Sequence, residues 1–128
     1  MTPSRRLRPI RLVIADDRPH ARRALRALLA TQAGFEVVGE ASDGVEAIAI
    51  VERLRPDLVL LDVRMPRLDG VTATARIKAR WPAVRVVAHS LAIERRAEAL
   101  AAGADVFVSK DAPVEVLLGA LRAQGTST

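Results

Sequence analysis

Five polar side chains in this chain each stand where a short apolar run ends: Asp16, Asp17, Asp62, Ser90 and Lys110. If the apolar runs are neighbouring parallel strands, the five side chains meet at the carboxyl edge of one sheet, where open α/β sheets bind ligands. Three clustered carboxylates repel one another and need a hard cation beside them. An aspartate next to such a cation can act as a nucleophile. The pattern therefore predicts a cation-dependent site with a nucleophilic carboxylate.

The apolar pattern alternates between two kinds of segment. Short, mostly β-branched runs predict buried strands in five places: 10–15, 35–40, 57–61, 84–89 and 105–109. Helical spacing follows, most clearly in the last helix, where apolar residues recur at i, i+3, i+4 and i+7: Val114, Leu117, Leu118 and Leu121. This order predicts an α/β fold, a (βα)5 doubly wound domain with a five-stranded parallel sheet and helices on both faces.

Turn and capping residues agree with this order. Asp43 predicts a capped start for the second helix, and Asp69–Gly70 predicts a turn before the third. Gly103 predicts a left-handed stop after the fourth helix. That helix, expected at about 91–102, is rich in Ala, Glu and Arg and has few large apolar residues, so we expect it to be locally the least stable.

The composition is that of one ordinary globular domain. Half of the 128 residues are hydrophobic, 27% are charged and none is cysteine, which excludes disulfides and thiol chemistry. No apolar stretch is long enough to span a bilayer, and the basic segment 1–11 precedes too short an apolar run for a secretion signal. We expect a cytoplasmic chain without membrane contact, built of a basic tail (1–9), one domain (10–123) and a polar tail (124–128).

The net charge of +5 comes almost wholly from arginine. A basic balance can indicate nucleic-acid binding. Aromatic side chains that could stack on bases are few, however: Phe35, Trp81 and Phe107. Solvated arginines explain the charge better, so direct DNA binding is the weaker interpretation.

The ordered set of motifs resembles a known family. The pair Asp16–Asp17, the stretch LLDVRMP at 60–66 with Asp69–Gly70, then Ser90 and Lys110, are similar to the receiver domain of bacterial two-component response regulators, over roughly residues 10–123. The stretch and the final Lys-Asp resemble the branch that often carries a C-terminal helix-turn-helix. The resemblance implies a flavodoxin-like fold and a phosphoacceptor switch that controls an output, transcription through an effector domain absent from this chain.

The resemblance also implies a role for each residue. Asp62 is the expected phosphoacceptor, which receives its phosphoryl group from a histidine kinase or a phosphotransfer protein. Asp16, Asp17, Asp62 and the backbone carbonyl of Arg64 are the expected ligands of one Mg²⁺, a cation that suits few carboxylates with several waters. Lys110 and Ser90 are expected to bind the phosphoryl oxygens.

Switching is implied as well. When Ser90 moves toward the phosphoryl group, Phe107 is expected to turn inward as the switch aromatic. The change is expected to reach the face made of the helix at 91–102, the strand at 105–109 and the last helix, a face that commonly pairs two receivers into a homodimer.

Four positions depart from the family's usual pattern. Asp111 follows Lys110 in place of the usual proline, so the cis peptide bond of many relatives is not expected here. Phe107 lacks the hydroxyl of the commoner tyrosine, so a ring that turns inward can form no hydrogen bond and is held by packing alone. Leu91, after Ser90, is larger than the usual small residue and is expected to narrow access to Asp62. Arg64 places a long cation near the mouth of the site.

Other interpretations stay open from the residues alone. Carboxylates and hydroxyls after strands often cap helices, and each residue taken singly supports that plainer interpretation; the ordered set favours function. An aspartyl-phosphate phosphatase or phosphotransferase is a second class, but such enzymes tend to carry an acid two residues after the nucleophile, where this chain has Arg64. We therefore expect no enzyme beyond self-phosphorylation from phosphodonors and autodephosphorylation. The intact set argues against a third class, a module that only keeps the fold.

Overall fold

The computed structural model describes residues 8–123, so the expected polar tail and most of the expected basic tail lie outside the described part. The strands are β1 (Ile10–Ala15), β2 (Phe35–Ala41), β3 (Leu58–Leu61), β4 (Arg85–Ser90) and β5 (Val106–Ser109). The helices are α1 (Pro19–Ala30), α2 (Gly44–Leu54), α3 (Gly70–Arg80), α4 (Arg96–Ala101) and α5 (Val114–Arg122), with a 3₁₀ turn, η1 (Ile93–Arg95), before α4.

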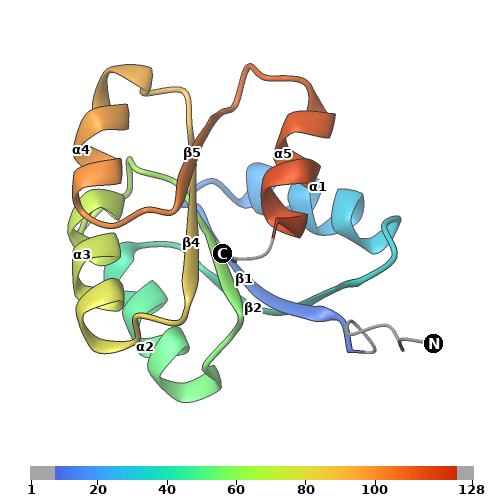
Figure 1. Cartoon of the computed structure of the whole chain (residues 1–128), viewed down its shortest axis with the longest axis horizontal. Coiled ribbons are helices and arrows are strands. Elements are labelled where there is room, and N and C mark those ends of the chain that lie inside the picture. The colour runs from blue at the N-terminus through green and yellow to red at the C-terminus, as the bar shows by residue number, and fades with distance from the viewer. Residues whose placement is uncertain (1–7, 124–128) are drawn as a thin grey trace.

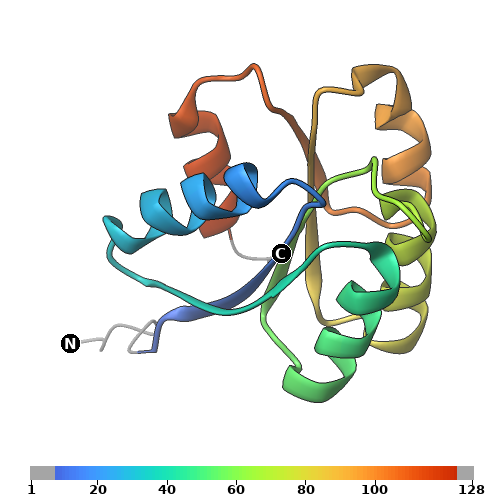
Figure 2. The ribbon, with the colours of Figure 1, turned by 180° about the vertical axis from the view of Figure 1, so that it is seen from behind.

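The sheet is parallel throughout, in the order β2-β1-β3-β4-β5. Helices α1 and α5 cover one face, and α2, α3 and α4 cover the other (Figures 1 and 2). The predicted doubly wound α/β fold is therefore confirmed. None of the helices in residues 8–123 is long and apolar enough to cross a membrane.

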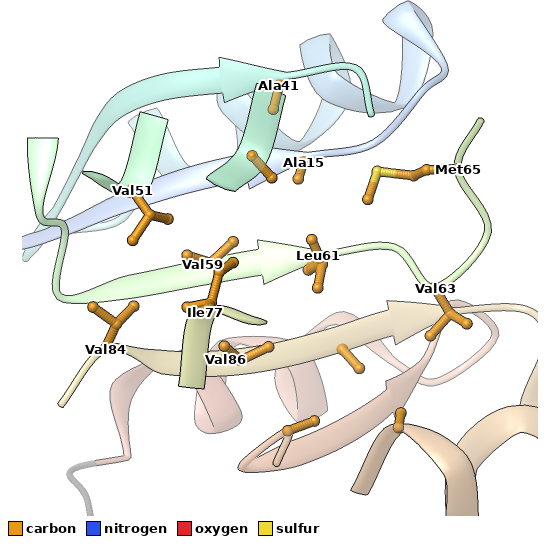
Figure 3. Packing of buried hydrophobic residues seen from close by; sticks show 14 of the residues in the cluster. Ala15, Ala41, Val51, Val59, Leu61, Val63, Met65, Ile77, Val84 and Val86 are labelled. Carbon is orange, nitrogen blue, oxygen red and sulfur yellow. The ribbon is translucent and has the colours of Figure 1, made fainter. Parts of the chain in front are cut away.

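Two apolar cores hold the helices to the sheet. The larger gathers side chains from α2, β3 and α3, among them Val51, Val59 and Ile77 (Figure 3). The other joins β1, β3 and β4 to α1 and α5 through residues such as Leu29 and Leu118. β3 is buried along its whole length, as a central parallel strand must be when helices cover both faces.

The register brings the ends of the strands together. Ala15 pairs with Leu61, Leu61 with Ala88, and Ser90 with Ser109. β2 lies on one side of β1, and β3 lies on the other. The strand order therefore reverses at β1, and the loops after β1 and β3 lead away in opposite directions. Open α/β sheets bind ligands at such a point.

Most predicted elements are confirmed, with bounds shifted by a residue or two. Asp43 accepts a hydrogen bond from the Glu46 amide at 2.8 Å, so the predicted cap of α2 is present. Asp69, expected in a turn, also caps α3, because it accepts a hydrogen bond from the Thr72 amide at 2.9 Å. Gly103 ends the α4 region with φ of +112°, in the left-handed region that favours glycine.

The expected helix at 91–102 is wrong at its start. Ser90 Oγ accepts a hydrogen bond from the Ala92 amide at 3.0 Å, and the Ile93 amide donates to the Leu91 carbonyl at 2.9 Å. These local hydrogen bonds hold the chain in a tight turn after β4, because a serine side chain competes with the helix for nearby amides. Regular helix begins only at Arg96, which leaves α4 six residues long.

Candidate functional site

The three predicted carboxylates lie together at the carboxyl edge of the sheet. Asp16, Asp17 and Asp62 each offer an oxygen within 4.8 Å of the others'. Asp16 and Asp62 are buried, and buried charges are costly unless they are paired. Lys110 pairs with both, since its Nζ donates to Asp16 Oδ2 at 2.6 Å and to Asp62 Oδ2 at 2.9 Å. Asp17 is exposed.

Asp16 is fastened by its backbone as well as by its side chain. Its amide donates to the Ala41 carbonyl at 3.0 Å, and its Oδ1 accepts from the Arg18 amide at 2.9 Å. Its own carbonyl accepts a hydrogen bond from Arg22 Nη1 at 2.6 Å. Asp17, in contrast, makes no hydrogen bond or ion pair through its carboxylate within residues 8–123. Its oxygens are therefore available to a ligand.

Asp62 is positioned from both sides. Its amide donates to the Ala15 carbonyl at 2.9 Å, which continues the β1–β3 ladder, and its Oδ1 accepts from the Arg64 amide at 3.1 Å. The start of α3 lies directly against it: a Cβ on Gly70 would stand 2.1 Å from the Asp62 carbonyl oxygen. Only glycine allows this approach, so α3 and the loop after β3 form one firm wall.

A cleft of about 530 Å³ opens beside the carboxylates. Its lining includes Asp17, Asp62, Arg64, Ser90, Leu91 and Arg95. Ser90 is buried, and its hydroxyl donates to no acceptor within the described part of the chain. Leu91 is 52% exposed and lines the cleft; that it narrows access to Asp62 stays a prediction.

Two ion pairs join the loop after β3 to the segment after β4. Arg64 Nη2 lies 3.0 Å from Glu94 Oε2, and Arg95 Nη2 lies 3.4 Å from Asp69 Oδ2. Arg64 and Glu94 are both about two-thirds exposed, and such exposed pairs contribute little to stability.

His89 is half-buried on β4, next to Ser90. Burial, together with the Lys110 ammonium, lowers its pKa to about 4, although the charges of Asp62 and Asp16 oppose the shift. The imidazole is therefore neutral at pH 7 and adds no charge to the site.

The structure brings together the five polar residues that the sequence singles out. The Arg64 amide donates to Asp62, and the Arg64 side chain forms an ion pair with Glu94. That the Arg64 carbonyl binds a metal ion stays a prediction. Phe107 is half-buried on β5 against the core of the α2–α3–α4 face. Sequence reasoning missed Arg22, whose contact with Asp16 joins residues six apart in different elements.

The fold and the site define a doubly wound α/β domain with a carboxylate cleft, suited to a hard cation, at its switch point. Residues 12–122 match the family model described as response regulator receiver domain. The chain belongs to this family. The domain bounds of 10–123 expected from the sequence stay a prediction.

Three relatives illustrate the match. The chain is 44% identical, over 80% of its length, to protein-glutamate methylesterase/protein-glutamine glutaminase 4 of Myxococcus xanthus, and 36% identical, over 91%, to the uncharacterized transcriptional regulatory protein YhcZ of Bacillus subtilis. It spans only 30% and 55% of these two relatives. The crystal structure of the response regulator domain of Thermotoga maritima CheB aligns over 90% of this chain and 95% of its own, with 32% identity and a TM-score of 0.82.

Proposed function

We propose that this chain is a phosphoacceptor signalling switch in which Asp62 receives a phosphoryl group from a histidine kinase or phosphotransfer protein. The observation that carries the proposal is the buried Asp16–Asp62 pair held by Lys110, beside the exposed Asp17 and the cleft. A carboxylate oxygen of Asp62 forms the new bond to phosphorus as the phosphorus–nitrogen bond of the donor's phosphohistidine breaks. The imidazole keeps that electron pair and takes a proton from solvent.

The donor set fits Mg²⁺, because three carboxylate oxygens lie within reach of one ion and the Asp17 carboxylate has no partner within residues 8–123. Asp16, Asp17, Asp62 and the Arg64 carbonyl hold it in this proposal. Bound there, Mg²⁺ supplies neutralising charge to the phosphoryl oxygens, on which phosphoryl transfer chiefly depends. Lys110 adds a second positive charge, and the free Ser90 hydroxyl donates to the same oxygens.

The signal then passes to the surface formed by α4, β5 and α5. Phosphorylation adds charge and strong acceptors beside Ser90, which favours movement of the turn at Leu91 and Ala92 toward the phosphoryl group. Phe107 turns inward as that turn moves, and the exposed surface pairs two copies of the chain. Because the proposed kinases phosphorylate their partners in the cytoplasm, we propose that this chain is cytoplasmic.

We propose that the output is the control of transcription. An effector domain outside this chain would bind the DNA, and this chain itself would not. The Bacillus subtilis relative, described as a transcriptional regulatory protein, supports this. The more similar Myxococcus xanthus relative favours a second candidate, control of a methylesterase domain. DNA-protection and glutamate methyl ester hydrolysis assays on the longest product of the gene, with and without phosphorylation, separate the two.

The chain is not proposed as a phosphatase or phosphotransferase with its own substrate. Arg64 stands two residues after Asp62, where those enzymes carry their second acid, and its guanidinium lies on Glu94. Turnover of a chromogenic phosphate ester in the presence of Mg²⁺ would contradict this view.

Acetyl phosphate with Mg²⁺, followed by intact mass measurement, tests the proposed function. The wild-type chain should gain one phosphoryl group, and Asp62→Asn should gain none. Asp57→Asn is the matched control, because Asp57 precedes β3 at the opposite edge of the sheet and should leave the modification unchanged. If the Asp62→Asn variant still gains the mass of a phosphoryl group, the phosphoacceptor is another residue.

A further inference from the structure

We propose that Arg22 is a positioning residue that aims the Asp17 carboxylate at the cation site. The inference rests on the proposed function and assigns to α1 a part in building the site. Arg22 donates from Nη1 to the Asp16 carbonyl at 2.6 Å and from Nε to Glu40 Oε1 at 3.2 Å. One guanidinium thus ties the loop after β1 to the end of β2.

The contact acts on Asp17 through the peptide bond. The Asp16 carbonyl and the Asp17 amide and Cα share one plane, because the peptide unit is rigid. A hydrogen bond that fixes the carbonyl therefore fixes the direction in which the chain enters Asp17. Asp17 is exposed, and its carboxylate has no protein partner within residues 8–123. Its direction is therefore set by the two peptide units beside it: the Asp16 carbonyl, which Arg22 holds, and the Arg18 amide, which donates to Asp16 Oδ1 at 2.9 Å.

Glu40 anchors the guanidinium. Burial by itself raises the pKa of Glu40, but the hydrogen bonds and charges of Arg26 and Arg22 outweigh this and lower it, so the carboxylate is ionised at pH 7. Charge-assisted hydrogen bonds to arginine are among the strong ones and hold the planar group in a fixed orientation. Arg22 is also the more enclosed of the two arginines, with 19% of its side chain exposed against 50% for Arg26.

Arg26 supplies a matched control. It donates from Nε to Glu40 Oε2 at 2.6 Å, but within residues 8–123 it makes no hydrogen bond or ion pair with the loop after β1. Arg22→Gln and Arg26→Gln therefore both remove one cation from Glu40 and one charge from α1. Only Arg22→Gln also releases the Asp16 carbonyl.

The test is a titration of each unphosphorylated protein with Mg²⁺, followed by the NMR shifts of the Asp17 and Arg18 amides. Residues that orient metal ligands typically change metal affinity by 10–100-fold, so Arg22→Gln should raise the dissociation constant for Mg²⁺ on the order of tenfold. Arg26→Gln should change it by less than about twofold, as expected for an exposed pair. Acetyl phosphate kinetics supply the second readout: Arg22→Gln should need more Mg²⁺ for half-maximal modification, while its rate at saturating Mg²⁺ stays near that of the wild type.

Each alternative outcome decides against the inference. Equal Mg²⁺ affinities for Arg22→Gln and Arg26→Gln would overturn it, and so would a lower rate at saturating Mg²⁺ with unchanged affinity, which indicates general structural damage. If Arg22→Gln does not fold, Arg22→Lys carries the test, because an ammonium keeps the charge but cannot reproduce the planar pair of donors; an unchanged affinity in that variant would refute the role. A wild-type chain that is modified at Asp62 while these variants show no difference refutes only the inference. A wild-type chain that takes up neither Mg²⁺ nor phosphoryl refutes the proposed function and the inference together.

Discussion

Acidification from about pH 7.5 to about pH 5 should destabilise this protein through His89. The pKa of His89 is lowered from its ordinary value of 6.5 to about 4, first by burial and then by the Lys110 ammonium. Between these two values the unfolded chain binds a proton that the folded chain does not bind. The free energy of unfolding therefore falls as the pH drops through this range, and the loss is complete only below about pH 4.

The expected size follows from the shift. Each unit of pKa difference corresponds to about 1.4 kcal/mol, so linkage predicts a loss of about 2 kcal/mol at pH 5. The acids with lowered pKa do not interfere in this window. The ordinary values of Glu40 and Asp43 are 4.5 and 3.8, and their contributions are lost only as the pH falls below those values.

Urea unfolding of the wild type, His89→Gln and His20→Gln, measured from about pH 5 to about pH 7.5, gives the answer. The wild type and the control at exposed His20 should share the same pH slope, and His89→Gln should lose it. An NMR titration of the His89 ring supplies a direct check. A His89 pKa above about 6, or an unchanged slope in His89→Gln, would refute the reasoning from burial and from the Lys110 charge.

Two substitutions test contacts that shape the site. Gly70→Ala should lower the free energy of unfolding by at least about 2 kcal/mol, because the added methyl meets the Asp62 carbonyl at 2.1 Å; a urea midpoint equal to that of the wild type would contradict this close approach. Asp43→Ala should cost about 1–2 kcal/mol, since it removes the cap on the Glu46 amide and the buried partner of Arg67. The same measurement checks it, and Asp43→Asn, which keeps the cap acceptor, should lose less.

Much of the fold could be predicted from the sequence because strand and helix periods differ. The buried runs that end at Ala15 and Leu61 also fixed where the carboxylates lie, since parallel strands end at one edge. The start of the fourth helix could not be predicted in this way. Its sequence favours helix, but the hydrogen bonds from the Ala92 amide to Ser90 and from the Ile93 amide to Leu91 hold this segment in a turn.

Arg22 shows a different limit. Its partners are a backbone carbonyl and Glu40, and Glu40 lies beside it only because β2 pairs with β1. Arginines at Arg22 and Arg26, one helical turn apart, look like an exposed basic stripe in the sequence. The one available signal in the sequence was Glu40, an acid near the end of the strand that follows this helix.

The contact between Gly70 and Asp62 makes the two sides of the cleft unequal in stiffness. On the β3 side, the start of α3 and the backbone of Asp62 are in close contact, so neither can shift without the other. On the β4 side, a short 3₁₀ turn and a six-residue helix are held by few buried side chains. A phosphoryl group added to Asp62, as proposed above, should therefore displace the turn after β4 rather than α3.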